Sequence, residues 1–170
     1  VNVIQYPSPT GNRCYQLGKA IRKAVEAFPA NLKVAIFGTG GMSHQLQGER
    51  AGLVNADFDI AFLDDLTRNV DRLVRIPHVE YLREAGSEGA ELVMWMIMRG
   101  ALDDDAREVY RHFHVPASNT AAGLIILENP WCGWAFLGWV RRVVGLLPIL
   151  PNLQFRSVPM TPLMFVRRTE

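Results

Sequence analysis

The chain has 170 residues, of which 49% are hydrophobic and 21% charged, and its formal net charge is +1. This length predicts at most one domain, large enough to bury a core, and the near-zero charge argues against a dedicated nucleic-acid-binding or acidic-surface-binding protein. The two cysteines, Cys14 and Cys132, form no CxxC pair and no disulfide framework, which is typical of a protein in a reducing cytoplasm. No signal peptide is visible, because the apolar start at Val1–Tyr6 is too short.

The first elements predict an α/β arrangement. Val1–Gln5 has the pattern of a buried strand, Arg13–Phe28 has apolar residues at helical spacing, and Val34–Phe37 is an apolar run typical of a strand covered on both faces. A strand, a helix and a strand in this order imply a parallel pair. We therefore expect an α/β fold with a mixed or parallel central sheet flanked by helices. Because the chain opens on Val1 inside a strand pattern, we also expect the domain to be incomplete.

A glycine-rich turn follows the second strand and leads to a histidine. Gly38, Gly40 and Gly41 allow the backbone to turn sharply or to approach a ligand closely, because they carry no Cβ. His44 comes next, just past the carboxyl end of a buried strand, where open α/β sheets place their ligands. The residues alone leave two readings of His44 open, a structural histidine and an acid–base group.

The same turn partly resembles the dinucleotide-binding fingerprint GxGxxG, with Asp57 or Asp59 about twenty residues further on. Ser43, however, stands where the third glycine or alanine belongs. Residues 44–52, HQLQGERAG, also lack the apolar face of the helix that should hold the pyrophosphate. These departures argue against a dinucleotide site.

Several helices are predicted in the middle of the chain. Asp57–Leu66, Val70–Val74 and His78–Glu84 have the pattern of short helices, and Glu91–Met98 is apolar on almost every side, which is typical of a buried helix. Glu91 is conspicuous there, because an ionised carboxylate in a buried helix needs a cation, a metal or a hydrogen-bond network. A paired core carboxylate and a metal ligand both remain open for this residue.

The next segment predicts a charged surface helix over Asp103–His112 and a strand over Gly123–Leu127. His112 and His114 form an HxH pair that could bind a metal on a strand. Near the end of a charged helix, we expect both histidines to be surface groups instead.

The tail after residue 128 differs in composition from the rest of the chain. It has one acidic residue, Glu170, against five arginines, and it holds three of the four tryptophans. Arg141 and Arg142 argue against a transmembrane helix, because each costs about 3 kcal/mol at a bilayer centre; a membrane-surface helix stays an alternative. We expect residues 1–128 to form the domain and residues 129–170 to be a basic, Trp- and Pro-rich tail foreign to it.

Three long segments carry a family resemblance. They are GTGGMSHQLQGERAGL (38–53), YLREAGSEGAELVMWMIMRGAL (81–102) and HVPASNTAAG (114–123). Together they closely resemble the catalytic beta chains of the protocatechuate 4,5-dioxygenases, which belong to the class III extradiol ring-cleaving dioxygenases. The resemblance extends back through RCYQLGKAI (13–21) and covers residues 1–128, as the C-terminal part of a catalytic domain.

The resemblance implies roles for four residues. The family holds a non-haem Fe(II) with two histidines and one glutamate, and that glutamate aligns with Glu91. The family's acid–base histidine, which takes a proton from the catechol, aligns with His44. Ser118 and Asn119 align with residues that contact the ring carboxylate of the substrate.

The resemblance also implies what this chain lacks. The family's two histidine ligands lie before the first strand seen here, and no histidine of this chain matches their motifs. We therefore expect extradiol cleavage of a catechol-type acid such as protocatechuate, with O2 and Fe(II), only together with the missing N-terminal half, and we expect a small alpha subunit as a partner. Membrane and nucleic-acid partners are not expected. A non-catalytic binding or scaffold module of the same fold and an inactive truncated gene product are the alternatives.

Overall fold

The structure, a computed structural model, describes residues 7–30, 33–130 and 165–167. The helices are α1 (Gly11–Ala27), α2 (Ala56–Arg68), α3 (Val70–Arg75), α4 (His78–Glu84), α5 (Gly86–Gly89), the 3₁₀ helix η1 (Ala90–Met94) and α6 (Trp95–Gly100). The strands are β1 (Lys33–Ala35), β2 (Arg107–His114), β3 (Ala122–Glu128) and β4 (Phe165–Arg167).

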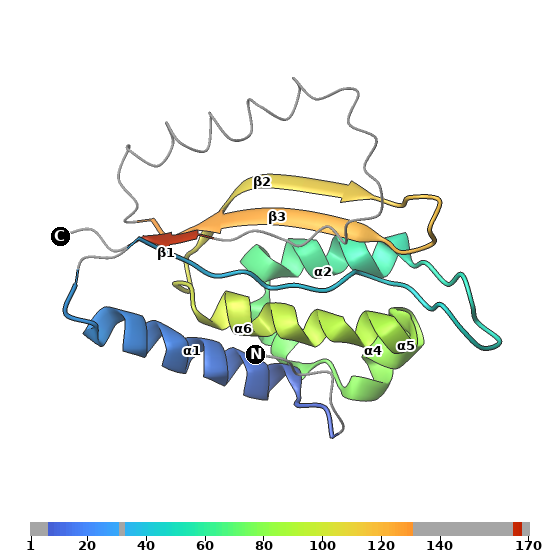
Figure 1. Cartoon of the computed structure of the whole chain (residues 1–170), viewed down its shortest axis with the longest axis horizontal. Coiled ribbons are helices and arrows are strands. Elements are labelled where there is room, and N and C mark those ends of the chain that lie inside the picture. The colour runs from blue at the N-terminus through green and yellow to red at the C-terminus, as the bar shows by residue number, and fades with distance from the viewer. Residues whose placement is uncertain (1–6, 31–32, 131–164, 168–170) are drawn as a thin grey trace.

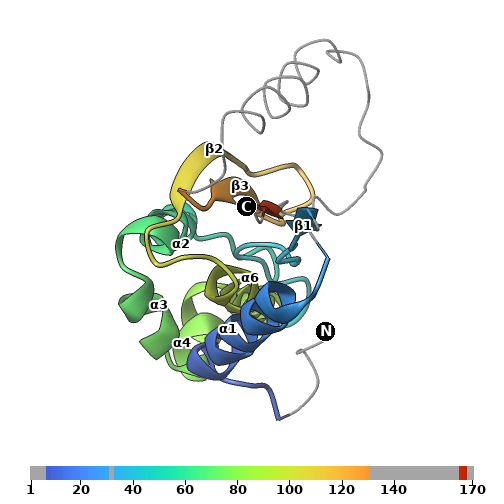
Figure 2. The ribbon, with the colours of Figure 1, turned by 90° about the vertical axis from the view of Figure 1, so that its left-hand side faces the viewer.

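The helices lie on one side of the strands (Figure 1). The α2 helix and the row from α4 to α6 lie next to the strands, and α1 lies outermost, against α6. The view turned by 90° shows the same order of layers (Figure 2). The long connection from β1 to α2 runs between β3 and the row from α4 to α6, so that it is held by strands and helices at once.

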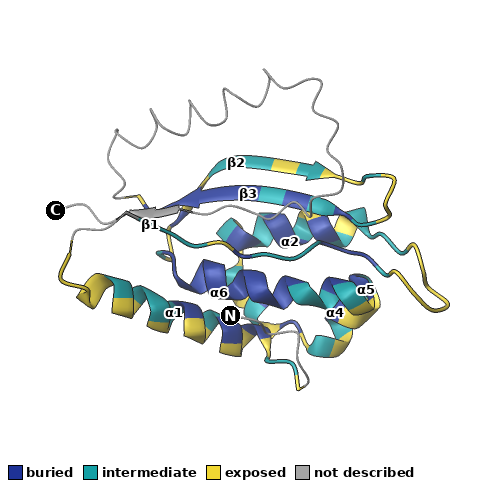
Figure 3. Ribbon diagram, in the orientation of Figure 1, coloured by how far each residue is buried: buried dark blue, intermediate teal, exposed yellow. Residues whose placement is uncertain are grey.

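The core lies between β3 and the helices α2 and α6, where burial is most complete (Figure 3). Phe62 of α2, Tyr81 of α4 and Trp95 of α6 are fully buried and pack edge to face, with ring centroids 6.0 Å apart for Phe62 and Trp95 and 6.4 Å apart for Phe62 and Tyr81. Such aromatic pairs each contribute about 0.5–1.5 kcal/mol beyond the area they bury. This cluster fixes α4 and α6 against α2.

The helices predicted over Arg13–Phe28, Asp57–Leu66, Val70–Val74 and His78–Glu84 are present, each with ends within two residues of the expected ones. The buried helix expected over Glu91–Met98 is also present, but it starts as the 3₁₀ helix η1 and continues as α6. Glu91 itself lies at the edge of the core, because its side chain is 21% exposed.

The surface helix expected over Asp103–His112 is wrong, since Arg107–His114 forms strand β2. It pairs antiparallel with β3, from Arg107 opposite Glu128 to His114 opposite Ala122, with an irregularity between Glu108 and Tyr110. Valine, tyrosine and phenylalanine within this segment favour a pleated, half-buried surface. The charged residues that suggested a helix lie on the outer strand of the pair.

The second predicted strand is shorter and less covered than expected. It spans only Lys33–Ala35, and Phe37 beyond it is 46% exposed. It pairs antiparallel with β4 of the tail, so both strand pairs of the described ranges are antiparallel. The expected parallel partner, Val1–Gln5, lies outside the described residues. The arrangement is compatible with an α/β fold, and the parallel pair stays a prediction.

In the ranges that the structure describes, no helix combines the length and the apolar character needed to cross a membrane. The membrane-surface helix that is the alternative for the tail falls outside those ranges. Of the tail beyond Pro130, only β4 is described.

Candidate functional site

His44 lies in the connection between β1 and α2, where backbone hydrogen bonds hold it from two sides. On the helix side, the His44 N–H donates to the Ala85 carbonyl at 2.8 Å, and Gly89 N–H donates to the His44 carbonyl at 3.3 Å. On the strand side, His44 forms an isolated antiparallel bridge with Thr120, just before β3. The histidine is therefore fixed between the start of α5 and the start of β3.

This close contact requires glycine at position 86. Gly86 has φ +91°, and a Cβ there would overlap the His44 carbonyl oxygen. The AGSEG segment (85–89), which lies just before Glu91, thus makes room for the His44 backbone.

The His44 ring is buried, and its environment selects one tautomer. Nδ1 lies 2.8 Å from the Met42 carbonyl oxygen. A carbonyl only accepts hydrogen bonds, so Nδ1 carries the proton and the neutral ring presents an unprotonated Nε2. That Nε2 lies 3.9 Å from Oε1 of Glu91. An imidazole held in this way can accept a proton at Nε2, and the carboxylate beside it stabilises the resulting charge.

Glu91 lies in the 3₁₀ helix η1 and contacts the glycine turn. Its Oε1 accepts a hydrogen bond from the Gly41 N–H. Gly40 has φ +126°, and a Cβ there would lie 2.9 Å from Cγ of Glu91. The Trp95 indole N–H donates to the Gly40 carbonyl at 3.4 Å. The glycine turn and the helix therefore fit around the carboxylate, and they bring together two of the residues that the sequence analysis singled out.

Ser118 and Asn119 lie in the exposed turn between β2 and β3. Asn119 has φ +54°, and its N–H donates to the Pro116 carbonyl at 3.2 Å. Thr120, the next residue, is the one that bridges His44. The turn is thus a neighbour of the histidine along the backbone, while the Ser118 and Asn119 side chains form no hydrogen bond with His44 or Glu91 in this structure.

Asp59 and Ser43 were not predicted as site residues, yet both are fully buried beside the histidine. Oδ1 of Asp59 accepts from the Ser43 N–H at 2.9 Å, and Oδ2 accepts from the Ser43 hydroxyl at 2.6 Å. Burial raises the pKa of Asp59 to about 6, against the opposing effect of the Ser43 hydrogen bonds. The sequence contained a signal for Asp59, because it shares a helical face with Phe62, Leu63 and Leu66 at spacings of three, four and seven.

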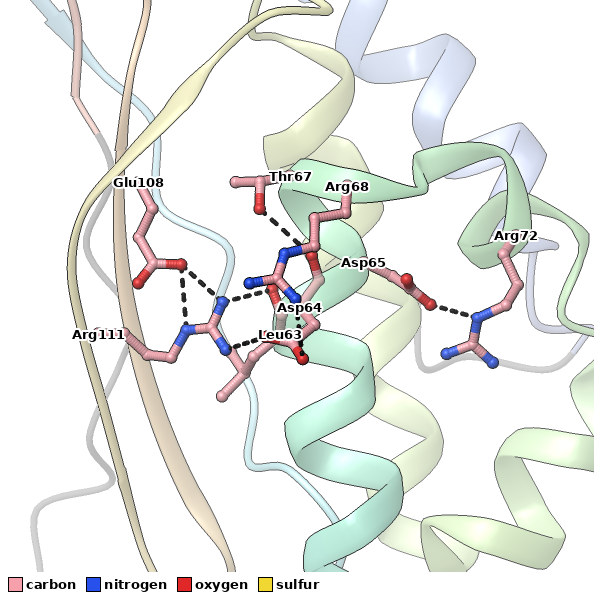
Figure 4. Close-up of polar contacts among 8 residues, drawn as sticks. All are labelled: Leu63, Asp64, Asp65, Thr67, Arg68, Arg72, Glu108 and Arg111. Carbon is pink, nitrogen blue, oxygen red and sulfur yellow. Dashed lines mark hydrogen bonds and ion pairs between the residues drawn. The ribbon is translucent and has the colours of Figure 1, made fainter.

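A cluster of ion pairs fixes the far end of α2 against β2 (Figure 4). The Arg111 guanidinium contacts Asp64 at 2.5 Å and Glu108 at 2.6 Å, and it donates to the Leu63 carbonyl at 3.3 Å. The Arg111 hydrogen bond is the main cause of the lowered pKa of Asp64. None of these contacts involves His44, and together they join α2 to β2.

The described residues do not complete a metal centre. No group of three or more His, Cys, Asp or Glu side chains within the described ranges could hold a metal ion. The donor set near the glycine turn suits one carboxylate ligand, Glu91. His112 and His114 are exposed on β2 with their rings stacked 6.4 Å apart, which confirms them as surface groups.

The fold is a domain of helices and strands. At its candidate site, a buried histidine whose Nδ1 faces a carbonyl lies opposite a carboxylate, beside a glycine turn. Residues 1–124 match the family of the catalytic LigB subunit of aromatic ring-opening dioxygenase, and the chain belongs to this family. It is also similar to the gallate dioxygenase of Pseudomonas putida, with 45% identity over 129 residues, which are 76% of this chain. The chain spans 38% of the length of that relative.

Proposed function

We propose that this chain is part of the catalytic subunit of an extradiol dioxygenase, which opens the ring of a catechol-type aromatic acid with O2 and a non-haem Fe(II). The observation that supports this most is the 3.9 Å approach of His44 Nε2 to Glu91 Oε1 inside the segment that matches the family. Protocatechuate is the substrate expected from the resemblance, and the name of the Pseudomonas relative adds gallate as a second candidate.

In this proposal Glu91 is one ligand of the iron, and the two histidine ligands come from outside the described residues. The iron would supply open coordination positions for the substrate and O2. Glu91 suits this role because its carboxylate is fixed by the Gly41 N–H and is still partly accessible. A small alpha subunit as a further partner remains part of the same proposal.

His44 acts as the general base. Its Nε2 takes the proton of a catechol hydroxyl, while the Nδ1–H bond to the Met42 carbonyl keeps the ring in place. The imidazolium that forms is stabilised by the Glu91 carboxylate 3.9 Å away. Because the ring is buried, this interaction is weakly screened by water.

Ser118 and Asn119 bind the ring carboxylate of the substrate. Their hydroxyl and amide groups are neutral donors in an exposed turn, so they can approach an incoming anion by directed hydrogen bonds. The bridge between Thr120 and His44 supports this role, because it ties that turn to the general base.

The test is a chimaera in which the matched segment of this chain replaces its counterpart in the Pseudomonas gallate dioxygenase. We expect the chimaera to take up oxygen with protocatechuate or gallate.

His44→Ala should lower turnover by about 100-fold or more, the usual range for loss of a general base, and leave iron content unchanged. Glu91→Ala should remove the iron. A folded, iron-loaded chimaera that turns over neither acid contradicts the proposal and favours a non-catalytic module. Iron lost from His44→Ala but kept by Glu91→Ala reverses the two roles.

A further inference from the structure

We propose that Asp59 is a positioning residue for His44 and acts on it through the peptide bond between Met42 and Ser43. Its consequence for turnover rests on the function proposed above, whereas its effect on the His44 ring does not. The contact chain runs from the Asp59 carboxylate to the Ser43 N–H, across the peptide to the Met42 carbonyl, and from there to Nδ1–H of His44.

The geometry of the peptide unit makes this connection rigid. The N–H of Ser43 and the carbonyl of Met42 belong to one planar group and point in opposite directions when the bond is trans. Oδ1 of Asp59 holds the N–H at 2.9 Å. Fixing that end also fixes the direction of the carbonyl, which accepts from His44 Nδ1 at 2.8 Å. Asp59 therefore sets the orientation of the imidazole without touching it.

The charge of the carboxylate also acts along this chain of hydrogen bonds. An acceptor bound to a peptide N–H polarises the peptide, which makes its carbonyl a stronger acceptor, and this effect grows in a low-dielectric interior. Asp59, Ser43 and Met42 are all fully buried. The arrangement favours the tautomer with the proton on Nδ1, which leaves the lone pair on Nε2, the atom that faces Glu91.

The second carboxylate oxygen of Asp59 and the Ser43 hydroxyl also form hydrogen bonds, and these keep Asp59 in one orientation. The Ser43 hydroxyl donates to Oδ2 of Asp59 at 2.6 Å and accepts from the Asn55 N–H at 2.7 Å. Asn55 also caps α2 by accepting from the Phe58 N–H. The start of the helix that carries Asp59 is thus joined to the same serine. A buried carboxylate is costly unless it is fully hydrogen-bonded, and here both oxygens bond to one residue next to His44.

The experiment is nitrogen-15 NMR of the imidazole groups in the 170-residue chain at one pH above 7. The chain has four histidines, so His44→Gln assigns the His44 signals. We expect the wild type to show the Nδ1-protonated tautomer. Asp59→Ala should show a mixture of the Nδ1- and Nε2-protonated tautomers, and Asp59→Asn should keep the Nδ1-protonated tautomer with a weaker Nδ1 hydrogen bond. Ser43→Ala should change the proportion of the two tautomers least, because the backbone N–H that contacts Asp59 remains.

The matched control is Asp64→Asn. Asp64 is an aspartate of the same helix, but it pairs with Arg111 and not with Ser43. The control variant should leave the His44 signals at their wild-type positions. If Asp59→Ala fails to fold by near-ultraviolet circular dichroism, Asp59→Asn decides. An unchanged tautomer and an unchanged Nδ1 proton shift in Asp59→Asn, with Asp59→Ala unchanged or unfolded, overturn the inference.

A second readout uses the chimaera described above. Asp59→Asn should lower kcat by about 10- to 100-fold, the range found when an outer residue that orients a reacting group is changed, with KM changed less than about 2-fold. Equal loss in kcat and in folded protein would show a structural role only. If the chimaera has no activity at all, the proposed function fails, while the NMR result still decides the role of Asp59.

Discussion

Asp59 places a carboxylate in the core, and this makes the stability of the chain depend on pH. Its pKa is about 6 in the folded chain against an ordinary value of 3.8, so folding favours the protonated form. The stability that this group contributes is complete below the unfolded value and is lost as the pH rises through the folded value. A shift of about two pKa units corresponds to about 3 kcal/mol.

We therefore expect the difference in free energy of unfolding between the wild type and Asp59→Asn to change with pH. From below pH 3.8 to above pH 6, the wild type should lose about 3 kcal/mol relative to the variant. Urea denaturation over this range measures the difference. The same series with Asp64→Asn is the control, and it should slope the other way, because the pKa of Asp64 is lowered. A flat difference for Asp59→Asn would contradict the expected shift.

At the scale of single residues, the sequence pointed to the two main groups of the proposed site, His44 and Glu91, but not to Asp59, the residue proposed to position His44. His44 and Glu91 stand out as a polar residue after a glycine turn and as an acid in an apolar helix. Asp59 shared a face with core residues, but an aspartate in a surface helix has an ordinary explanation in solvent. Only the folded chain brings it to Ser43, sixteen positions earlier. That contact depends on the path of the loop, which no local pattern encodes.

At the scale of elements, Arg99 of α6 joins three parts of the fold. Its side chain is 1% exposed and donates to the carbonyls of Leu66, Asp103 and Asp104, at 2.6, 2.9 and 2.9 Å. Burial lowers its pKa. The guanidinium therefore connects the end of α2 with the turn that leads from α6 to β2. The single ammonium group of a lysine could not reach all three carbonyls.

We expect Arg99→Lys to destabilise the chain by about 3 kcal/mol or more, because buried carbonyls that lose their donor cost about 1–3 kcal/mol each. Chemical denaturation followed by far-ultraviolet circular dichroism measures this. The control is Arg68→Lys, since the Arg68 side chain is 74% exposed and its ion pair with Asp64 is long, at 3.7 Å; it should change stability by less than about 0.5 kcal/mol. Equal effects of the two changes would contradict the role given to Arg99.

The elements also show where sequence patterns fail. Apolar periodicity located the helices, because packing against a core imposes a regular spacing. The charged residues of strand β2 favour a helix in the sequence, whereas in the structure they form ion pairs with residues of α2 and β3 that are distant in sequence. Arg111 contacts Asp64, and Arg107 contacts Glu128. A short strand such as β1 carries too few residues for its pairing to be predicted, and its partner lies in the tail.

At the scale of the whole molecule, the proposed site is a set of parts held by different segments. The glycine turn leads into the loop that carries His44, the 3₁₀ helix η1 carries Glu91, and the turn between β2 and β3 carries Ser118 and Asn119. The chain covers 38% of the gallate dioxygenase that it resembles. The described ranges contain one carboxylate suited to the proposed metal and no group of three potential ligands. Activity should therefore depend on residues that these ranges do not supply.

We expect the 170-residue chain alone to bind Fe(II) weakly and to take up no oxygen with protocatechuate or gallate, because one carboxylate does not fix the geometry of a transition metal. Oxygen-electrode traces with anaerobically added Fe(II) test this, with the chimaera as the positive control. Free Fe(II) is oxidised by O2 to Fe(III), which in turn oxidises catechols slowly, so the decisive comparison is with Glu91→Ala of the same chain. Uptake by the chain that matches Glu91→Ala is background and agrees with the expectation. Uptake that disappears with Glu91→Ala would mean that the chain completes an iron site by itself, and the requirement for additional ligands would then be wrong.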